Sequence, residues 1–188
     1  ILAEMKYFLL FIAVLCISGK SDAQFRKYFD NKTLRLDYYH CGNAGAEQFF
    51  FDELIEEPFW AGSETKLIDT NGFGNHMVEV RTVDTGELIF SRGYCTLFDE
   101  WQTTPEAKTT DCCYPESVIM PFPREKIAVS ITSRSKKGVF EKKFEYTVDP
   151  KSYFIKKERE QLPVFDVVNS GDPAKKVDLV LLPEGYTE

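Results

Sequence analysis

Between residues 33 and 148 the chain alternates apolar and polar side chains with a period of two, in short runs that end at glycine or proline. Such alternation is typical of half-buried β-strands, because successive side chains of a strand point to opposite faces of the sheet. The pattern predicts seven strands, at residues 33–40, 48–55, 76–83, 87–91, 117–120, 126–133 and 139–148. We therefore expect an all-β fold, an immunoglobulin-like antiparallel β-sandwich of about seven strands, with a jelly-roll-like sandwich as second choice.

Residues 1–23 have the pattern of a secretory signal peptide. Lys6 supplies a positive charge, residues 7–17 form an apolar run, and the small residues Ser21 and Ala23 occupy the −3 and −1 positions of a cleavage site. We expect cleavage after Ala23, a mature chain that begins at Gln24, and a secreted, periplasmic or cell-surface location.

The same leader is not expected to anchor the chain. Its apolar run is too short to span a bilayer. Cys16 follows Leu15, whereas the cysteine of a lipoprotein usually follows a small residue. Four residues precede Met5, so the true start codon stays open.

Charge and histidine content exclude several classes of function. The chain carries 23 Lys and Arg against 30 Asp and Glu, a formal net charge of −7, and has no basic tract. Nucleic acids and anionic membrane surfaces are therefore poor partners. Its two histidines, His40 and His76, nearly exclude a histidine-based metal site made by this chain alone. We interpret both as strand-end residues bonded to backbone or water.

Removal of the leader would leave Cys41, Cys95, Cys112 and Cys113. Four cysteines in an exported chain permit disulfides. The adjacent pair Cys112 and Cys113 is not expected to bridge to itself, because that ring is strained. The remaining alternatives are one disulfide or buried free thiols. The adjacent cysteines lack the C-x-x-C spacing of a zinc site.

Two further local patterns have plain interpretations. Residues 69–74 place oxygen ligands at positions one and three of a calcium-type loop, but Phe73 and Val80 occupy positions that need oxygen. A turn is the better interpretation. Trp60 and Trp101 are either sugar-stacking platforms or core residues, and packing in the core is favoured.

The character of the sequence changes after Pro150. We divide the chain into a signal peptide at 1–23, a β-sandwich domain at 24–155, a linker at 156–174 and a final segment at 175–188. Residues 177–182 are almost continuously apolar, as in the first buried strand of an α/β domain. We expect the sequence to be truncated near the start of a catalytic domain.

Several blocks in fixed order resemble bacterial IgA-peptidase-like zinc metallopeptidases, over about residues 24–188. The blocks are 24–29 (QFRKYF), 33–40 (TLRLDYYH), 60–63 (WAGS), 67–69 (LID), 91–94 (SRGY), 100–107 (EWQTTPEA), 121–123 (PFP) and 177–187 (VDLVLLPEGYT). The resemblance implies an N-terminal β-sandwich followed by a catalytic domain, with zinc on an H-E-x-x-H helix.

The sequence contains no H-E-x-x-H, so no catalytic, cofactor-binding or metal-binding residue is transferred onto this chain. The resemblance implies a non-catalytic accessory domain that packs on the catalytic domain of the same polypeptide, with zinc bound there and not here. The family name points to immunoglobulin A as a substrate, although no residue pattern in this chain indicates recognition of an immunoglobulin hinge peptide. The alternative is a stand-alone secreted or surface module that binds a glycan or a host protein.

Overall fold

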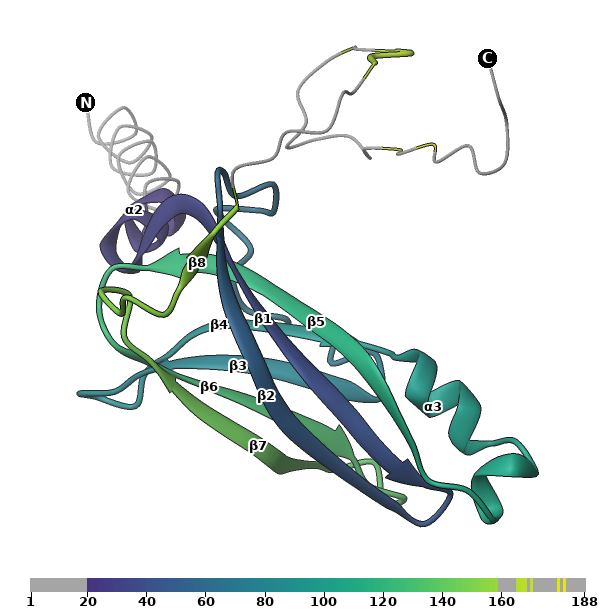
Figure 1. Ribbon diagram of the computed structural model, residues 1–188. Helices are drawn as coiled ribbons and strands as arrows, with labels where there is room; N and C mark the ends of the chain where they lie inside the picture. Colours follow the sequence, from purple (N-terminus) through teal and green to yellow (C-terminus); the bar gives the residue numbers. More distant parts are fainter. Residues whose placement is uncertain (1–19, 159–164, 169, 171–178, 180, 182–188) are drawn as a thin grey trace, which may run out of the picture.

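The computed structural model describes residues 20–158, 165–168, 170, 179 and 181. These residues form two four-stranded sheets packed face to face, with α2 and α3 at opposite ends (Figure 1). The elements in chain order are α2 (Lys20–Tyr28), β1 (Phe29–Asn43), β2 (Ala46–Glu57), β3 (His76–Thr82), β4 (Leu88–Tyr94), α3 (Leu97–Gln102), the 3₁₀ turn η1 (Glu106–Lys108), β5 (Cys112–Pro123), β6 (Ile127–Arg134), β7 (Phe140–Val148) and β8 (Lys156–Lys157).

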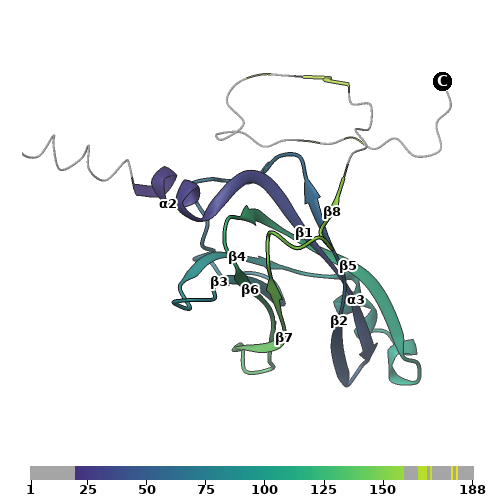
Figure 2. The ribbon, with the colours of Figure 1, turned by 60° about the vertical axis from the view of Figure 1, so that its left-hand side comes forward.

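The first sheet has the strand order β5-β1-β2-β8 and the second has the order β4-β3-β6-β7. Strands β2 and β8 run parallel, and the other described neighbours run antiparallel. Figure 2 shows the two sheets as separate layers. The β-sandwich predicted from the sequence is confirmed. All seven predicted strands are present, and β8 is an additional one.

Strand β5 is much longer than the four residues predicted for it. It runs from Cys112 to Pro123 and so includes Pro121 and Pro123, at which the strand was predicted to stop, as well as Pro115. Proline cannot donate a backbone hydrogen bond, so it is tolerated where one side of a strand has no neighbour. Among the described strands β5 pairs with β1 alone, at the edge of its sheet, and the proline therefore does not end it.

The core lies between the sheets and comes from alternate residues of each strand. Leu34, Leu36 and Tyr38 of β1 point inward, while Asp37 and Tyr39 between and beyond them are more exposed. Burial of each large apolar side chain contributes about 1.5–3 kcal/mol. The main inward-facing partners from the other strands are Val78, Val80, Ile89, Phe90, Met120, Ile127, Val129, Ile131 and Val148.

A disulfide joins Cys41 of β1 to Cys113 of β5, two residues that lie directly opposite each other in the ladder. The pairing was left open by the sequence, and the expectation that Cys112 and Cys113 do not bridge each other is confirmed. Cys95 is exposed, Cys112 is half-buried, and both are free thiols.

The residues after β7 are tied to the sheet edge. Backbone pairing places Lys156 beside Ile55, and the Lys156 ammonium pairs with Glu53. Arg35 Nη1 lies 3.9 Å from Glu158 Oε2. Strand β8 thus begins where the predicted linker at 156–174 begins.

Most of the predicted final segment, 175–188, lies outside the described residues, as does the predicted signal peptide up to residue 19. The expected cleavage point after Ala23 falls within α2. In the part of the chain that the structure describes, no helix has the length and apolar character needed to cross a membrane.

Candidate functional site

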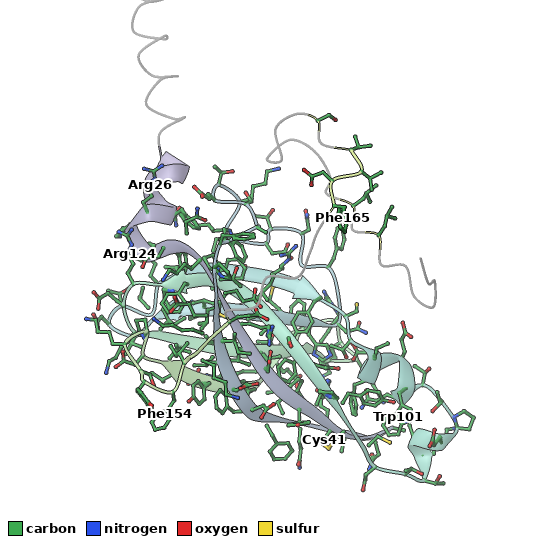
Figure 3. All side chains as sticks on the ribbon, turned by 45° about the horizontal axis from the view of Figure 1, so that its top comes forward. Arg26, Cys41, Trp101, Arg124, Phe154 and Phe165 are labelled. Atoms are coloured by element: carbon green, nitrogen blue, oxygen red, sulfur yellow. A yellow bond between two sulfur atoms is a disulfide. The ribbon has the colours of Figure 1, made fainter. Side chains whose placement is uncertain are left out.

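His40 and His76 face each other between the two sheets, near the end covered by α3. Their side chains are 0% and 1% exposed, and their ring centroids lie 5.2 Å apart. Figure 3 labels Cys41, next to His40 in β1, and Trp101 of α3, which both lie at this end of the sandwich. His76 is the first residue of β3, as expected for a strand-end residue, whereas His40 lies within β1. The expectation that both bond to backbone or water is wrong, because their partners are side chains.

The imidazole of His40 lies between two carboxylates. Its Nδ1 is 3.2 Å from Glu116 Oε2, and its Nε2 is 3.3 Å from Glu47 Oε2. Burial lowers the pKa of His40, but the hydrogen bonds to Glu116 and Glu47 outweigh burial and the pKa is raised. The ring packs between Phe49 and Phe98, with centroid distances of 4.1 and 3.9 Å. These contacts fix both the position and the plane of the imidazole.

His76 is held in the same manner from the opposite sheet. Its Nε2 lies 2.9 Å from Asp99 Oδ1, and its Nδ1 lies 3.1 Å from the Ser133 hydroxyl. Asp99 is positioned by the capping box of α3, in which it accepts a hydrogen bond from the Thr96 backbone N–H. Burial raises the pKa of Asp99, but hydrogen bonding to His76 and attraction to it lower the pKa by more.

A tyrosine pair extends the cluster toward solvent. The Tyr38 hydroxyl donates to Glu116 Oε2 at 2.9 Å and lies 3.1 Å from the Tyr94 hydroxyl. Burial raises the pKa of both phenols, so both stay protonated as donors. A hollow of about 200 Å³ adjoins them, lined also by Tyr114 and by the free thiol of Cys95.

The cluster places one nitrogen of each histidine and one carboxylate oxygen of Glu47 within 4.8 Å of one another. The pKa of Glu47 is raised by burial, but hydrogen bonds to His40 and Ser133 lower it by more, so the carboxylate is ionised. This is a set of nitrogen and oxygen donors, with no thiol among them. Among the residues that the structure describes, Ser133 is the one hydroxyl hydrogen-bonded to either imidazole, and it is buried.

Two other candidates from the sequence have structural roles. Trp60 and Trp101 are 7% and 9% exposed and pack against the core, so neither presents a stacking platform. The Asp69 carboxylate accepts backbone hydrogen bonds from Asn71, Gly72 and Gly93, which engages both of its oxygens within a turn.

A comparison with protein families shows where the chain belongs. The family described as Peptidase M64 N-terminus matches residues 24–145, more than half of the chain. The chain belongs to this family. M64 peptidases are IgA-peptidase-like metallopeptidases, so the family context predicted from the sequence is confirmed. A comparison with curated proteins finds no match.

The residues of this M64 N-terminal domain do not fit the catalytic zinc of an H-E-x-x-H helix. That chemistry needs two imidazoles four residues apart on one helical face. His40 lies on β1 and His76 on β3, in different sheets, and the chain has no other histidine.

Sequence reasoning missed Glu47, Asp99, Glu116 and Tyr94 as members of one cluster. Each lies on a different element, and an isolated acidic residue carries no signal of burial. One signal was available: His40 continues the inward alternation of Leu34, Leu36 and Tyr38 and should have been placed on the core face.

Proposed function

We propose that this chain is the non-catalytic N-terminal accessory domain of a secreted, IgA-peptidase-like zinc metallopeptidase. It packs against the catalytic domain of the same polypeptide and supports it. The family match over residues 24–145 carries the proposal, and the sequence has no H-E-x-x-H with which to hold a catalytic zinc itself. The zinc of the reaction belongs to the catalytic domain.

The junction after the sandwich supports a packing role. Residues 156–158 are bound to the edge of β2 by backbone pairing, and the Glu158 N–H donates to the Glu56 carbonyl at 3.0 Å. Lys157 Nζ also lies 4.0 Å from Glu56 Oε2. The chain therefore leaves the sandwich at Glu158 from a fixed point on the edge of the sheet.

The Cys41–Cys113 disulfide supports the proposed export. Disulfides persist in oxidising compartments and are rare in the cytosol. We expect a leader at 1–23, cleavage after Ala23 and a secreted, periplasmic or cell-surface location. Expression in a Gram-negative host followed by intact-mass measurement checks this, and a retained leader or a lipidated cysteine contradicts it.

The alternative function, a stand-alone module that binds a glycan or a host protein, has weaker support. Its best feature in the sequence was the pair Trp60 and Trp101, and both are buried. Glycan arrays and immunoglobulin pull-downs with the purified chain should therefore give no specific signal. Micromolar binding of one glycan class would favour the alternative.

The accessory role is tested by studying this chain and the protease domain separately. The purified chain should cleave neither casein nor immunoglobulin A. In a polypeptide that also contains the H-E-x-x-H domain, deletion of residues 24–158 should lower soluble yield and the melting temperature of the protease. A control with the glutamate of H-E-x-x-H changed to glutamine should lose activity and keep its stability. The proposal fails if the isolated chain hydrolyses protein, or if the protease is equally stable and active without 24–158.

A further inference from the structure

The buried cluster at the α3 end has the donors and the charge of a cation site. We propose that His40, Glu47 and His76 bind one zinc ion in the interior of the sandwich, at a site separate from the catalytic zinc of the protease. The ion links the two sheets and has a structural role. The expectation that two histidines nearly exclude a metal site treated them as separate, whereas the fold brings them together.

The donor set suits zinc. Imidazole nitrogen and carboxylate oxygen bind zinc at about 2.0–2.2 Å, and a tetrahedral site separates its donors by about 3.4 Å. His40 Nε2 and Glu47 Oε2 are already 3.3 Å apart. One donor atom of His76 lies within 4.8 Å of both, so shifts of about 1 Å would place three of the four ligands of such a site. Water or the Ser133 hydroxyl takes the fourth position, since that hydroxyl lies 3.1 Å from His76 Nδ1.

The surroundings of the two imidazoles match those of metal ligands. A histidine that binds a metal through one nitrogen usually donates from the other nitrogen to a carboxylate, which fixes the tautomer and the ring orientation. His40 has this arrangement, with Glu47 at Nε2 and Glu116 at Nδ1. His76 has it as well, with Asp99 at Nε2, and its Nδ1 lies 3.1 Å from the Ser133 hydroxyl, the candidate for the fourth position. Both histidines thus have a carboxylate behind them.

The charge of the cluster also calls for a cation. Glu47, Asp99 and Glu116 bring three negative charges, and Lys143 brings one positive charge 3.5 Å from Glu47 Oε1. Zinc binds neutral imidazole, so in the zinc-bound form the protein groups of the cluster have a net charge of −2, which one divalent ion balances. Without zinc, the raised pKa of His40 favours its imidazolium, which supplies part of this positive charge. Oε1 of Glu116 is buried and has no hydrogen-bond partner among the described residues, so acceptors exceed donors. The Glu116 side chain is 10% exposed.

The position of the site gives the ion its role. His40 and Glu47 belong to the β5-β1-β2-β8 sheet, and His76 belongs to the β4-β3-β6-β7 sheet. A single ion therefore links the two layers where the aliphatic core gives way to polar side chains. The Glu47 side chain is 17% exposed, so an ion can reach the site from solvent beside it.

Zinc titration of the purified, chelator-treated chain tests the proposal. We expect about one equivalent of zinc with submicromolar affinity, and a rise in melting temperature of at least about 5 °C at 100-fold excess over the dissociation constant. His76→Gln and Glu47→Gln should weaken binding by about 100-fold or more, and Asp99→Asn, which acts through His76, by about tenfold. Glu141→Gln, an exposed change on β7, should bind as the unmodified chain does. Cys95→Ser and Cys112→Ser should also bind normally, because the thiols are not ligands.

A second measurement needs no substitution and therefore does not depend on whether a variant folds. X-ray absorption of the zinc-loaded, unmodified chain should show nitrogen and oxygen ligands at about 2.0–2.1 Å with two imidazoles, and no sulfur at about 2.3 Å. Circular dichroism without zinc checks the fold of every variant. The proposal is overturned if the chain takes up no stoichiometric zinc, if sulfur is found in the ligand shell, or if folded His76→Gln and Glu47→Gln chains bind as the unmodified chain does. Any of these results leaves the three carboxylate–histidine contacts as ion pairs only.

Discussion

The interior of the sandwich is built from different chemistry at its two ends. Toward α2 the sheets meet through Phe29, Leu34 and Val80, which are held by apolar burial and require no particular partner. Toward α3 they meet through His40 and His76, each of which requires a carboxylate at hydrogen-bond distance. The apolar end should therefore tolerate changes that keep volume, whereas the polar end should tolerate few changes of any kind.

The largest effect is expected from His40→Leu, measured by urea denaturation with a chelator present. The substitution keeps the bulk of the side chain and removes from Glu47 and Glu116, both partly buried, the imidazole that lies between them. We expect a loss of about 3–5 kcal/mol in the free energy of unfolding, as when one member of a buried ion pair is removed. A loss below about 1 kcal/mol would show that the polar end behaves like the apolar end.

At the apolar end, Leu34→Ala should cost about 3 kcal/mol, because it removes buried volume from a fully buried position. Leu34→Met keeps most of that volume and should cost less than about 1.5 kcal/mol. The same denaturation measurement compares the pair. Equal losses for the two variants would mean that this end also depends on shape rather than on volume.

Reduction of Cys41–Cys113 should cost about 2 kcal/mol, near the low end of values for native disulfides. The flanking residues of β1 and β5 stay paired, so the polar end should remain folded. Thermal unfolding with and without a reductant measures the effect, and the Cys41→Ala, Cys113→Ala double variant is the control. Complete unfolding on reduction would show that the disulfide, rather than the histidine cluster, holds the α3 end together.

The smallest expected effect concerns Asp69, a carboxylate whose partners are backbone N–H groups. Hydrogen bonds from Gly93 and Gly72 hold its pKa below the ordinary value of 3.8. A lowered pKa means that the stabilisation is fully present above pH 3.8 and is lost as the pH falls through the pKa of the folded state.

Asp69→Asn should lower the free energy of unfolding by about 1 kcal/mol at neutral pH. The loss is small because the turn is half-exposed, and solvent weakens hydrogen bonds to a charged group there. The difference from the unmodified chain should shrink as the pH falls below 3.8. Denaturation at a series of pH values measures it. A difference that does not change with pH would assign the loss to packing rather than to charge.

Period-two alternation was sufficient to predict the sandwich, because burial of one strand face constrains every second residue. It located β1, β3 and β6 to within a few residues of their observed ends. It underestimated β5, because whether proline ends a strand depends on whether that strand is at an edge, and the sequence does not state sheet order. For the same reason β8 was not predicted: it is two residues long and exists through its pairing with β2.

The cluster was harder to predict than the fold. His40 and Glu47 are close in sequence across the β1–β2 hairpin, but Asp99 reaches His76 from α3, and Glu116 reaches His40 from β5. The first contact depends on where α3 packs, and the second depends on the pairing of β5 with β1 in one sheet. The sequence pattern states neither. Only the inward position of His40 was within reach of the sequence pattern.

The prolines of β5 have a consequence for the protein in a crowded environment. An open sheet edge offers unpaired N–H and carbonyl groups onto which a foreign strand can add, which is the first step of aggregation. Pro115, Pro121 and Pro123 remove three N–H donors from this edge, and the Cys41–Cys113 bond fixes the strand to its neighbour. The exported domain that we propose would work without cytosolic chaperones, and we expect these features of β5 to hinder the addition of a second copy at this edge.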